Sequence, residues 1–136
     1  MAATTTIQQT DFIPGVKPQE VYDALVDPRK HTEFTGAKAT GQAKVGAKFT
    51  AWDGYIFGKH LVLEPGRRVV QEWSTTEWPK DAPPSRLEWT FRVKGDGTEV
   101  TLVHSDVPAD QAESYRQGWI DYYWDPLKQY FEDQQE

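Results

Sequence analysis

The sequence predicts an α+β domain in which a long C-terminal helix lies across a curved antiparallel β-sheet. Three patterns predict this class. Helical signals follow a polar N-terminal segment, side chains alternate with period two between residues 48 and 105, and residues 109–136 repeat apolar positions every three or four. A one-sided sheet and an amphipathic helix each bury their apolar surface only against another element, so we expect them to face each other.

The length of the chain fits one domain. It has 136 residues, close to the common domain size, and we expect a single domain over residues 1–136. A domain of this size buries roughly two-thirds of the surface that its unfolded chain exposes. Aromatic residues make up 13% of the chain, with six each of Trp, Tyr and Phe. This share is more than most small cores need and indicates a roomy aromatic interior.

The composition argues against several classes of function. There is no cysteine, which excludes disulfides, thiolate catalysis and cysteine zinc sites. The net charge of -6 and the pI near 5.1 lack the basic surface of a nucleic-acid binder. The sequence shows neither a signal peptide nor an apolar run that could cross a membrane. We therefore expect a cytoplasmic protein with no nucleic-acid or membrane partner.

The N-terminal third predicts a strand and one or two short helices. Residues 4–13 are rich in Thr and Gln and are typical of a polar edge strand. Pro18 suits the first turn of a helix, and Pro28 ends that helix. Residues 28–34 allow one or two further helical turns. Residues 36–47 are small and polar, which predicts a loop.

From Lys48 the alternation predicts a meander of about five antiparallel strands with one apolar face. The pair Asp53-Gly54 predicts a hairpin, because glycine accepts a positive φ. Gly58 lies inside a strand and should leave a dent that another element can approach. The residues expected on the apolar face are Val69, Gln71 and Trp73, then Leu87, Trp89, Phe91 and Val93, and then Val100, Leu102 and His104.

The C-terminal segment predicts one long amphipathic helix. Its apolar stripe consists of Ala112, Tyr115, Trp119, Tyr123, Leu127 and Tyr130. Pro126 costs about 3 kcal/mol inside a helix, so we expect a kink between Tyr122 and Pro126. Trp119 should face Trp73 and Trp89 across the interior.

No catalytic chemistry is visible. The histidines His31, His60 and His104 are isolated, without the spacing of a metal site, and we expect no metal, no cofactor and no catalytic residue. His104 is expected to be a hydrogen-bonded core residue. The carboxylates fall at turns or on the polar face, so no general acid–base pair can be named and we expect a protein that is not an enzyme.

Six segments in order carry a family resemblance: VYDALVDPRKHTEFTG, DGYIFG, LEPGRRVVQEW, WPKDAPPSRLEWTF, GTEVTLVHSDVP and RQGWIDYYWDPLKQYF. From about Phe12 to Phe131 the chain resembles the activator of heat-shock protein 90 ATPase homologue (AHSA-like) family, within the START and pollen-allergen-like (SRPBCC) superfamily. The resemblance implies a helix-grip fold, in which a curved sheet grips the long helix around a cavity. Relatives bind apolar small molecules in this cavity or keep it nearly filled, and a few are enzymes.

The resemblance implies a non-enzymatic binding domain of one of two kinds. The first is a co-chaperone-like interaction module that binds an Hsp90-type chaperone. The second is a carrier or sensor of a small apolar or aromatic ligand. The activators also carry a separate N-terminal domain with an Asn-containing motif. No part of the 136 residues resembles that domain, and the sequence has no asparagine, so we do not expect full co-chaperone activity from these residues alone.

The two functions predict different sites. A ligand would be bound by Trp52, Trp73, Trp89, Phe91, His104, Tyr115, Trp119 and Tyr123. A chaperone would be bound by exposed aromatic residues, namely Trp78, Tyr122 and Trp124. One side of a helix covers only part of its circumference, so Trp124 and Tyr122 are expected near the surface. The alternative is that the neighbouring short helices cover them.

Overall fold

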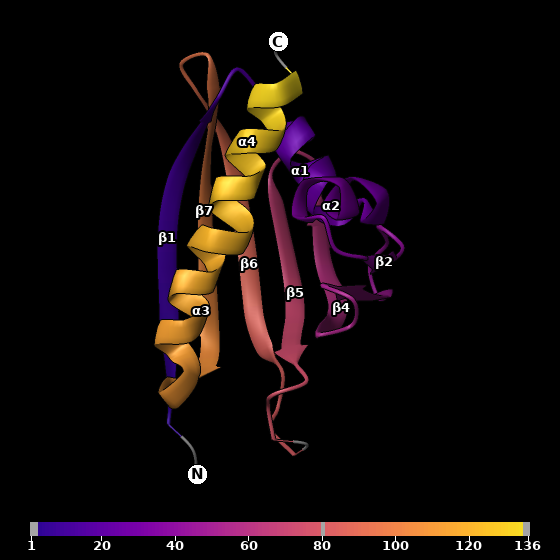
Figure 1. The fold of residues 1–136 in the computed structure, drawn as a ribbon, viewed down its shortest axis with the longest axis vertical. Helices are drawn as coiled ribbons and strands as arrows, with labels where there is room; N and C mark the ends of the chain where they lie inside the picture. The colour runs from indigo at the N-terminus through magenta and orange to yellow at the C-terminus, as the bar shows by residue number, and fades with distance from the viewer. Residues whose placement is uncertain (1–2, 80, 135–136) are drawn as a thin grey trace.

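A single antiparallel sheet of seven strands, crossed on one face by the C-terminal helix, organises the chain (Figure 1). The computed structural model describes residues 3–79 and 81–134. The strands are β1 (Thr4–Pro14), β2 (Thr40–Gly41), β3 (Lys48–Ala51), β4 (Ile56–Glu64), β5 (Arg68–Thr75), β6 (Ser85–Lys94) and β7 (Gly97–Pro108). The helical elements are α1 (Pro18–Val26), α2 (Pro28–Thr35), the 3-10 turn η1 (Ala109–Gln111), α3 (Ala112–Trp119), the π-helical η2 (Ile120–Trp124) and α4 (Asp125–Gln134). The predicted fold class is confirmed.

The first strand lies at an edge of the sheet, beside the last strand. The strand order is β1-β7-β6-β5-β4-β3-β2, so β1 pairs only with β7, with Ile13 opposite Thr98. The predicted edge position of β1 is therefore confirmed. The other edge is β2, a two-residue strand in the predicted loop that pairs with β3 through Thr40 and Thr50.

Both predicted short helices form, and local chemistry sets their ends. The backbone N–H of Lys17 donates to the Glu20 carboxylate at 2.7 Å, and Pro18 occupies the first turn of α1. The Asp27 carboxylate accepts from the Arg29 N–H at 2.9 Å and caps α2. Gly36, at φ 78°, ends α2 in the left-handed region that glycine adopts without strain.

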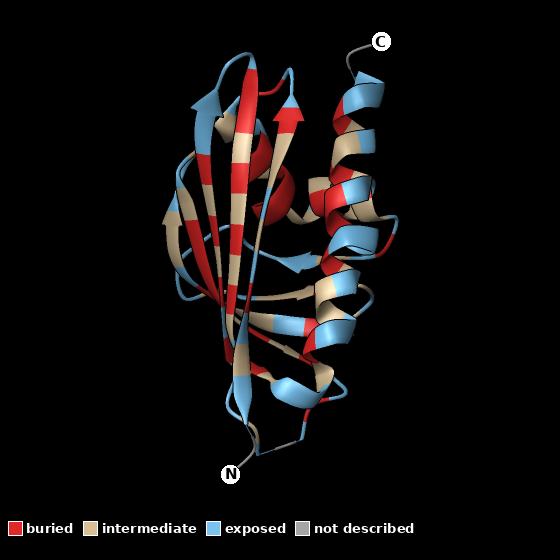
Figure 2. Cartoon of the chain, turned by 90° about the vertical axis from the view of Figure 1, so that its left-hand side faces the viewer, coloured by how far each residue is buried: buried red, intermediate tan, exposed pale blue. Residues whose placement is uncertain are grey.

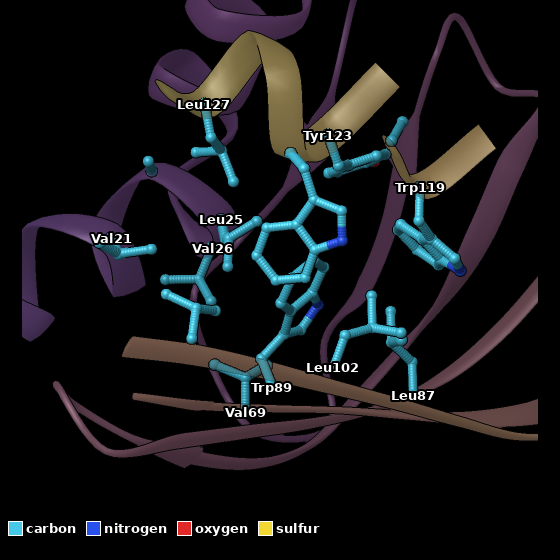
Figure 3. Packing of buried hydrophobic residues seen from close by; sticks show 14 of the residues in the cluster. Val21, Leu25, Val26, Val69, Leu87, Trp89, Leu102, Trp119, Tyr123 and Leu127 are labelled. Atoms are coloured by element: carbon cyan, nitrogen blue, oxygen red, sulfur yellow. The ribbon is translucent and has the colours of Figure 1, made fainter. Parts of the chain in front are cut away.

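The core lies between the sheet and the helices, as the buried bands in Figure 2 show. Trp89 points from the sheet toward η2 and α4, with Tyr123 and Leu127 above it (Figure 3). The residues predicted on the apolar face of the sheet are buried with one exception, and in the predicted helix stripe Tyr115 and Tyr130 are partly buried. Val93 is 71% exposed, because it lies where β6 runs into the hairpin to β7 and no side chain covers it.

The predicted break before Pro126 takes the form of a π-helical turn. The N–H of Asp125 donates to the carbonyl of Ile120, five residues back, rather than four. Pro126 follows directly and has no N–H to offer the preceding turn. The helix therefore continues through Pro126 instead of ending there, and the extra residue in the π-helical turn rotates the side chains of α4 relative to those of α3. No helix within the described ranges is both long and apolar enough to span a membrane.

Candidate site: an aromatic groove beside the C-terminal helix

A groove of about 460 Å³ opens between α3, η2 and the turn that joins β3 to β4. Its volume falls in the range typical of small-molecule sites. Seven of its ten lining residues are aromatic and none is charged. We call it the aromatic groove; its lining residues are Trp52, Tyr55, Ile56, Trp73, Ser114, Tyr115, Gly118, Trp119, Tyr122 and Tyr123.

Two buried indoles belong to both the groove and the core. The ring centroids of Trp73 and Trp119 are 5.4 Å apart, and Tyr115 packs edge-on to Trp73 at 5.5 Å. Trp119 also contacts Trp89, at 5.6 Å and nearly perpendicular. Edge-to-face contacts of this kind stabilise aromatic clusters beyond their buried area. The predicted cluster of Trp73, Trp89 and Trp119 is confirmed.

A hydrogen-bond network fixes one wall of the groove. The Tyr115 hydroxyl donates to Oε1 of Gln111 at 2.9 Å and accepts from Nε1 of Trp78 at 2.8 Å. The Thr75 hydroxyl lies 3.0 Å from the same oxygen and acts as a second donor, since the only proton of Tyr115 points to Gln111. The Tyr115 hydroxyl therefore joins three segments: the end of β5, the loop that follows it and the start of the C-terminal helical region.

The Tyr55 hydroxyl donates to the Glu77 carboxylate on the same side of the groove. Burial, and after it this hydrogen bond, raises the pKa of Tyr55. Tyr55 is thus a neutral donor at physiological pH and offers no anionic group.

The turn that joins β3 to β4, which contributes Trp52 to the groove, has an unusual backbone. Trp52, Asp53 and Gly54 all have positive φ, of 54°, 59° and 90°, so the predicted hairpin forms around three left-handed residues. This conformation is costly for a bulky residue such as Trp52. It places the Trp52 indole edge-on to Tyr122, with centroids 5.2 Å apart. Nε1 of Trp52 is buried without a hydrogen-bond partner.

Behind the groove the interior is filled. The inner cavity has a volume of about 30 Å³, which accommodates roughly one water molecule. It is lined by polar as well as apolar side chains, including His31, His60 and Gln71. Nε2 of His31 lies 3.0 Å from the Tyr123 hydroxyl, whereas Nδ1 of His31 is buried without a partner. Burial lowers the pKa of His31 to about 4.

His104 is a hydrogen-bonded core residue, as predicted. Its Nδ1 accepts from Nε1 of Trp119 at 3.3 Å, so the proton of the neutral ring resides on Nε2 and is donated to the Ser85 hydroxyl at 2.8 Å. The Ser85 hydroxyl donates in turn to the Trp73 carbonyl at 2.7 Å. Burial lowers the pKa of His104 to about 3. Across the described part of the chain, no group of His, Asp and Glu side chains could hold a metal ion.

Of the eight residues predicted to bind a ligand, five line the aromatic groove: Trp52, Trp73, Tyr115, Trp119 and Tyr123. Trp89 lines only the inner cavity. Phe91 packs on Tyr22, with centroids 6.3 Å apart, and His104 is enclosed in the core, so neither reaches the groove. Alternation along a strand predicts which face of the sheet a residue lies on, but it does not predict how far along the strand the groove lies.

Of the three residues predicted to be exposed for a partner, Tyr122 is 55% exposed. The prediction for Trp124 is wrong: it is 3% exposed, because it packs on Trp89 at 5.6 Å and donates to Gln9 of β1. Trp78 is also buried, between Trp73 and the Tyr115 hydroxyl. The first strand, rather than the short helices, supplies the polar partner of Trp124.

Sequence reasoning missed four lining residues, and one glycine was misinterpreted. Gly118 was predictable, since it lies three positions after Tyr115 on one face of the helix, and Ser114 lies four positions before Gly118. The other two missed residues, Tyr55 and Ile56, lie at the end of the turn. Gly58 does not leave a dent: a Cβ there would lie 1.9 Å from the backbone oxygen of Glu72. A glycine is needed at position 58 because β5 approaches closely there.

A curved antiparallel sheet that grips a long C-terminal helix, with an aromatic groove between them, defines a helix-grip binding domain. Comparison with known proteins narrows this class. The profile of the "Activator of Hsp90 ATPase homolog 1-like protein" family matches residues 15–132, and the chain belongs to this family.

Curated relatives carry the same designation. Activator of 90 kDa heat shock protein ATPase homolog 1 of Homo sapiens is 33% identical over 114 residues, which cover 84% of this chain and 33% of the relative. The Dictyostelium discoideum homolog is 33% identical over 115 residues, which cover 84% of this chain and 30% of the relative. The chain thus spans about a third of the length of these curated relatives.

Solved structures share the fold. An Hsp90 activator from Plasmodium falciparum superposes with a TM-score of 0.82 at 23% identity, over 94% of this chain and 95% of the other. Protein MLL2253 from Mesorhizobium loti gives a TM-score of 0.79 at 21% identity, over 95% and 98% of the two chains. At these identities the likeness concerns the fold alone.

Proposed function

We propose that this chain is a non-enzymatic binding domain that engages an Hsp90-type chaperone. The observation that carries the proposal is the similarity to curated relatives named as activators of the 90 kDa heat shock protein ATPase. The family match runs to residue 132 and therefore includes the helix beside the aromatic groove. The domain contributes a surface to the chaperone and no catalytic group.

Two exposed residues of η2 offer surface for a contact of this kind. Ile120 is 38% exposed and Tyr122 is 55% exposed. Large aromatic side chains are common anchors of interfaces, because they give much contact area for little lost entropy. The exposed Asp121 and Asp125 lie within and directly after the same segment. Exposed aromatic surface with carboxylates nearby in the chain suits a basic partner surface, and such binding weakens as salt is added.

Isothermal titration against the Hsp90-type chaperone of the same host, together with the chaperone's ATPase rate, tests the proposal. Tyr122→Ala is expected to weaken binding about tenfold or more, by removing an interface anchor. Phe57→Ala is the matched control, since Phe57 is also exposed but projects from β4 on the other face of the sheet from Ile56, which lines the groove. No heat at tens of micromolar, with an unchanged ATPase rate, removes the proposal.

A second candidate function is favoured by the aromatic groove itself, namely a carrier or sensor of a small apolar or aromatic ligand. Its volume of about 460 Å³ and its uncharged aromatic lining support this role. A polarity-sensitive apolar dye is expected to bind once per chain and to quench tryptophan emission. Gly118→Trp should abolish this binding by filling the groove, and dye binding that survives the change places the dye elsewhere.

A further inference from the structure

We propose that one edge of the sheet binds an extended acidic segment of a partner protein through a cluster of unpaired cations. We call this cluster the basic edge; its residues are Arg29, Lys30, Lys38, Lys44 and Lys48. The inference does not rest on either function proposed above, because the basic edge shares no residue with the aromatic groove or with η2.

The positive charge of the basic edge contrasts with the acidity of the chain. Residues 29–48 contain five cations and one carboxylate, that of Glu33, and therefore carry a net charge of +4. Since the whole chain carries -6, the other 116 residues carry -10. An anionic partner is therefore attracted to this edge and repelled by the net charge of the rest of the molecule.

The fold brings the segments that carry these cations together. The five cations lie in the first turn of α2, on both sides of β2 and at the start of β3. The backbone N–H of Ala39 donates to the Thr32 hydroxyl of α2 at 3.0 Å, and Gly41 of β2 pairs with Phe49 of β3. Figure 1 shows α2 beside β2, on the side of the sheet that lies away from β1. Cations from three elements therefore share one region of the surface.

These cations differ from the others in lacking ion pairs. Every cation of β4, β5, β6, α3 and α4 is within 4 Å of a carboxylate, whereas in the described ranges none of the basic edge is. The three carboxylates nearest in sequence accept hydrogen bonds from two backbone N–H groups and one phenol instead; they belong to Asp27, Asp53 and Glu33. The basic edge is thus available to an external anion.

Two of these placements oppose local stability. The first turn of α2 contains Arg29 and Lys30 and no acidic residue, although cations are disfavoured at the positive end of a helix. Lys48 lies directly opposite Lys59 where β3 pairs with β4, and like charges in this arrangement are destabilising. Lysines also protect sheet edges from aggregation, but that role does not require cations in α2. Departures from local preference of this kind are typical of functional sites.

An extended protein segment fits this edge better than other anions do. Since β2 pairs only with β3, its other side is open to a further extended chain. Val45, which is 57% exposed between Lys44 and Lys48, offers an apolar contact to such a chain. A nucleic acid would extend beyond the edge toward a molecule of net negative charge. A membrane would find only Val45 as an exposed large apolar residue among residues 29–48.

Fluorescence anisotropy of a labelled octapeptide of alternating Glu and Thr tests the proposal, with a neutral fluorophore and a reference peptide in which Gln replaces Glu. At about 20 mM salt the acidic peptide should bind once per chain, whereas the reference peptide should not bind at about 1 mM. Salt at about 300 mM should weaken binding about fivefold or more, because exposed charges are then screened. Amide NMR shifts induced by the acidic peptide should centre on residues 29–48.

Two double variants with the same change in net charge locate the site. Arg29→Gln with Lys30→Gln should weaken binding of the acidic peptide about fivefold or more. The midpoint of its thermal unfolding should not fall, because the change removes cations from the positive end of α2. The matched control is Lys17→Gln with Arg67→Gln, which removes two exposed cations before α1 and between β4 and β5. It should change the dissociation constant by less than about twofold.

The remaining outcomes decide between the occupants. Lys44→Gln with Lys48→Gln should weaken binding by a factor similar to that of the α2 variant, since the site includes both elements. Absence of binding at low salt, or an equal loss in the Lys17 and Arg67 control, overturns the proposal. Phosphatidylserine vesicles and a thymidine oligonucleotide, at equal charge concentration, should compete less well than the unlabelled acidic peptide. Stronger competition by either one overturns the choice of a protein segment.

Discussion

The indole N–H of Trp124 donates a 2.7 Å hydrogen bond to Oε1 of Gln9, a residue 115 positions earlier in the chain. Nε2 of Gln9 donates in turn to the carbonyl of Arg116 at 3.0 Å. At this point the helix changes pitch, and the N–H of Ile120 donates to the carbonyl of Gln117 rather than to that of Arg116. The Gln9 amide therefore supplies a donor to the Arg116 carbonyl. One amide of the first strand thus holds both sides of the π-helical turn.

This bridge predicts energetic coupling between Gln9 and Trp124. Trp124→Phe and Gln9→Ala should each lower the free energy of unfolding by about 1–2 kcal/mol, since each leaves a partly or fully buried polar group without its partner. The double variant should lose about 1 kcal/mol less than the sum of the single losses. Urea denaturation of the four proteins measures this cycle. Strict additivity would mean that the bond does not contribute.

Truncation of Trp89 should be among the costly core changes. Its ring contacts Trp119, Tyr123 and Trp124 beneath the helix. Trp89→Ala should lower the free energy of unfolding by about 3–5 kcal/mol, through lost burial and a residual cavity. The control is Val93→Ala on the same strand, whose side chain is exposed and whose change should stay within about 0.5 kcal/mol. A loss below about 1 kcal/mol for Trp89→Ala contradicts the packing.

Two glycines should respond to alanine in opposite directions. Gly118→Ala should raise the free energy of unfolding by about 0.5–1 kcal/mol, because the helix gains a better former and the new methyl meets no close neighbour. Gly58→Ala should lower it by on the order of 1–3 kcal/mol, because the methyl would collide with the backbone of Glu72. Thermal and urea unfolding compare the pair. Destabilisation by Gly118→Ala would show that packing requires the glycine after all.

Stability should fall in mild acid. Burial holds the folded-state pKa of His104 at about 3 and that of His31 at about 4, below the ordinary value of 6.5. The unfolded chain therefore takes up protons first as the pH falls below 6.5, so stability present above that value is lost progressively toward pH 4. Each histidine contributes a slope approaching about 1.4 kcal/mol per pH unit in this window.

Urea unfolding between pH 6 and pH 5 measures the slope before most carboxylates titrate. His104→Gln keeps a polar group near Ser85 and should reduce the slope by about 1 kcal/mol per pH unit. A free energy of unfolding that does not change over this range contradicts the buried neutral rings.

The sequence predicted which side chains point into the core better than it predicted which distant residues they contact. Period-two and helical spacing correctly brought Trp73, Trp89 and Trp119 together, because a side chain's direction follows from its local backbone. The same spacing could not show that Phe91 lies away from the groove. Position along a strand relative to a crossing helix depends on pairing register and on helix placement, which local patterns do not contain.

Two other errors have the same origin. Trp124 lies off the main apolar stripe of the helix. Its indole has a partner in Gln9 because β1, which pairs with β7, lies beneath the helix. Gly58 was recognised as a place where another element approaches closely; that element is β5, and its approach leaves no dent. The unpaired N–H of Trp52 had no sequence signal beyond the hairpin, since it follows from the particular left-handed turn.

The pairing of β1 with β7 also sets the order of events during synthesis. Of the strands in the described residues, β1 is made before the others, and it pairs with β7 alone, which is made after them, so at elongation rates of about 5–20 residues per second it waits for several seconds. The first seven residues of β1 are polar apart from Ile7, and its other large apolar residues, Phe12 and Ile13, lie near its end, which limits aggregation during that wait. Pulse-labelling hydrogen exchange on the refolding chain should find the amides of β1 protected after those of β5 and β6, whose pairing is local.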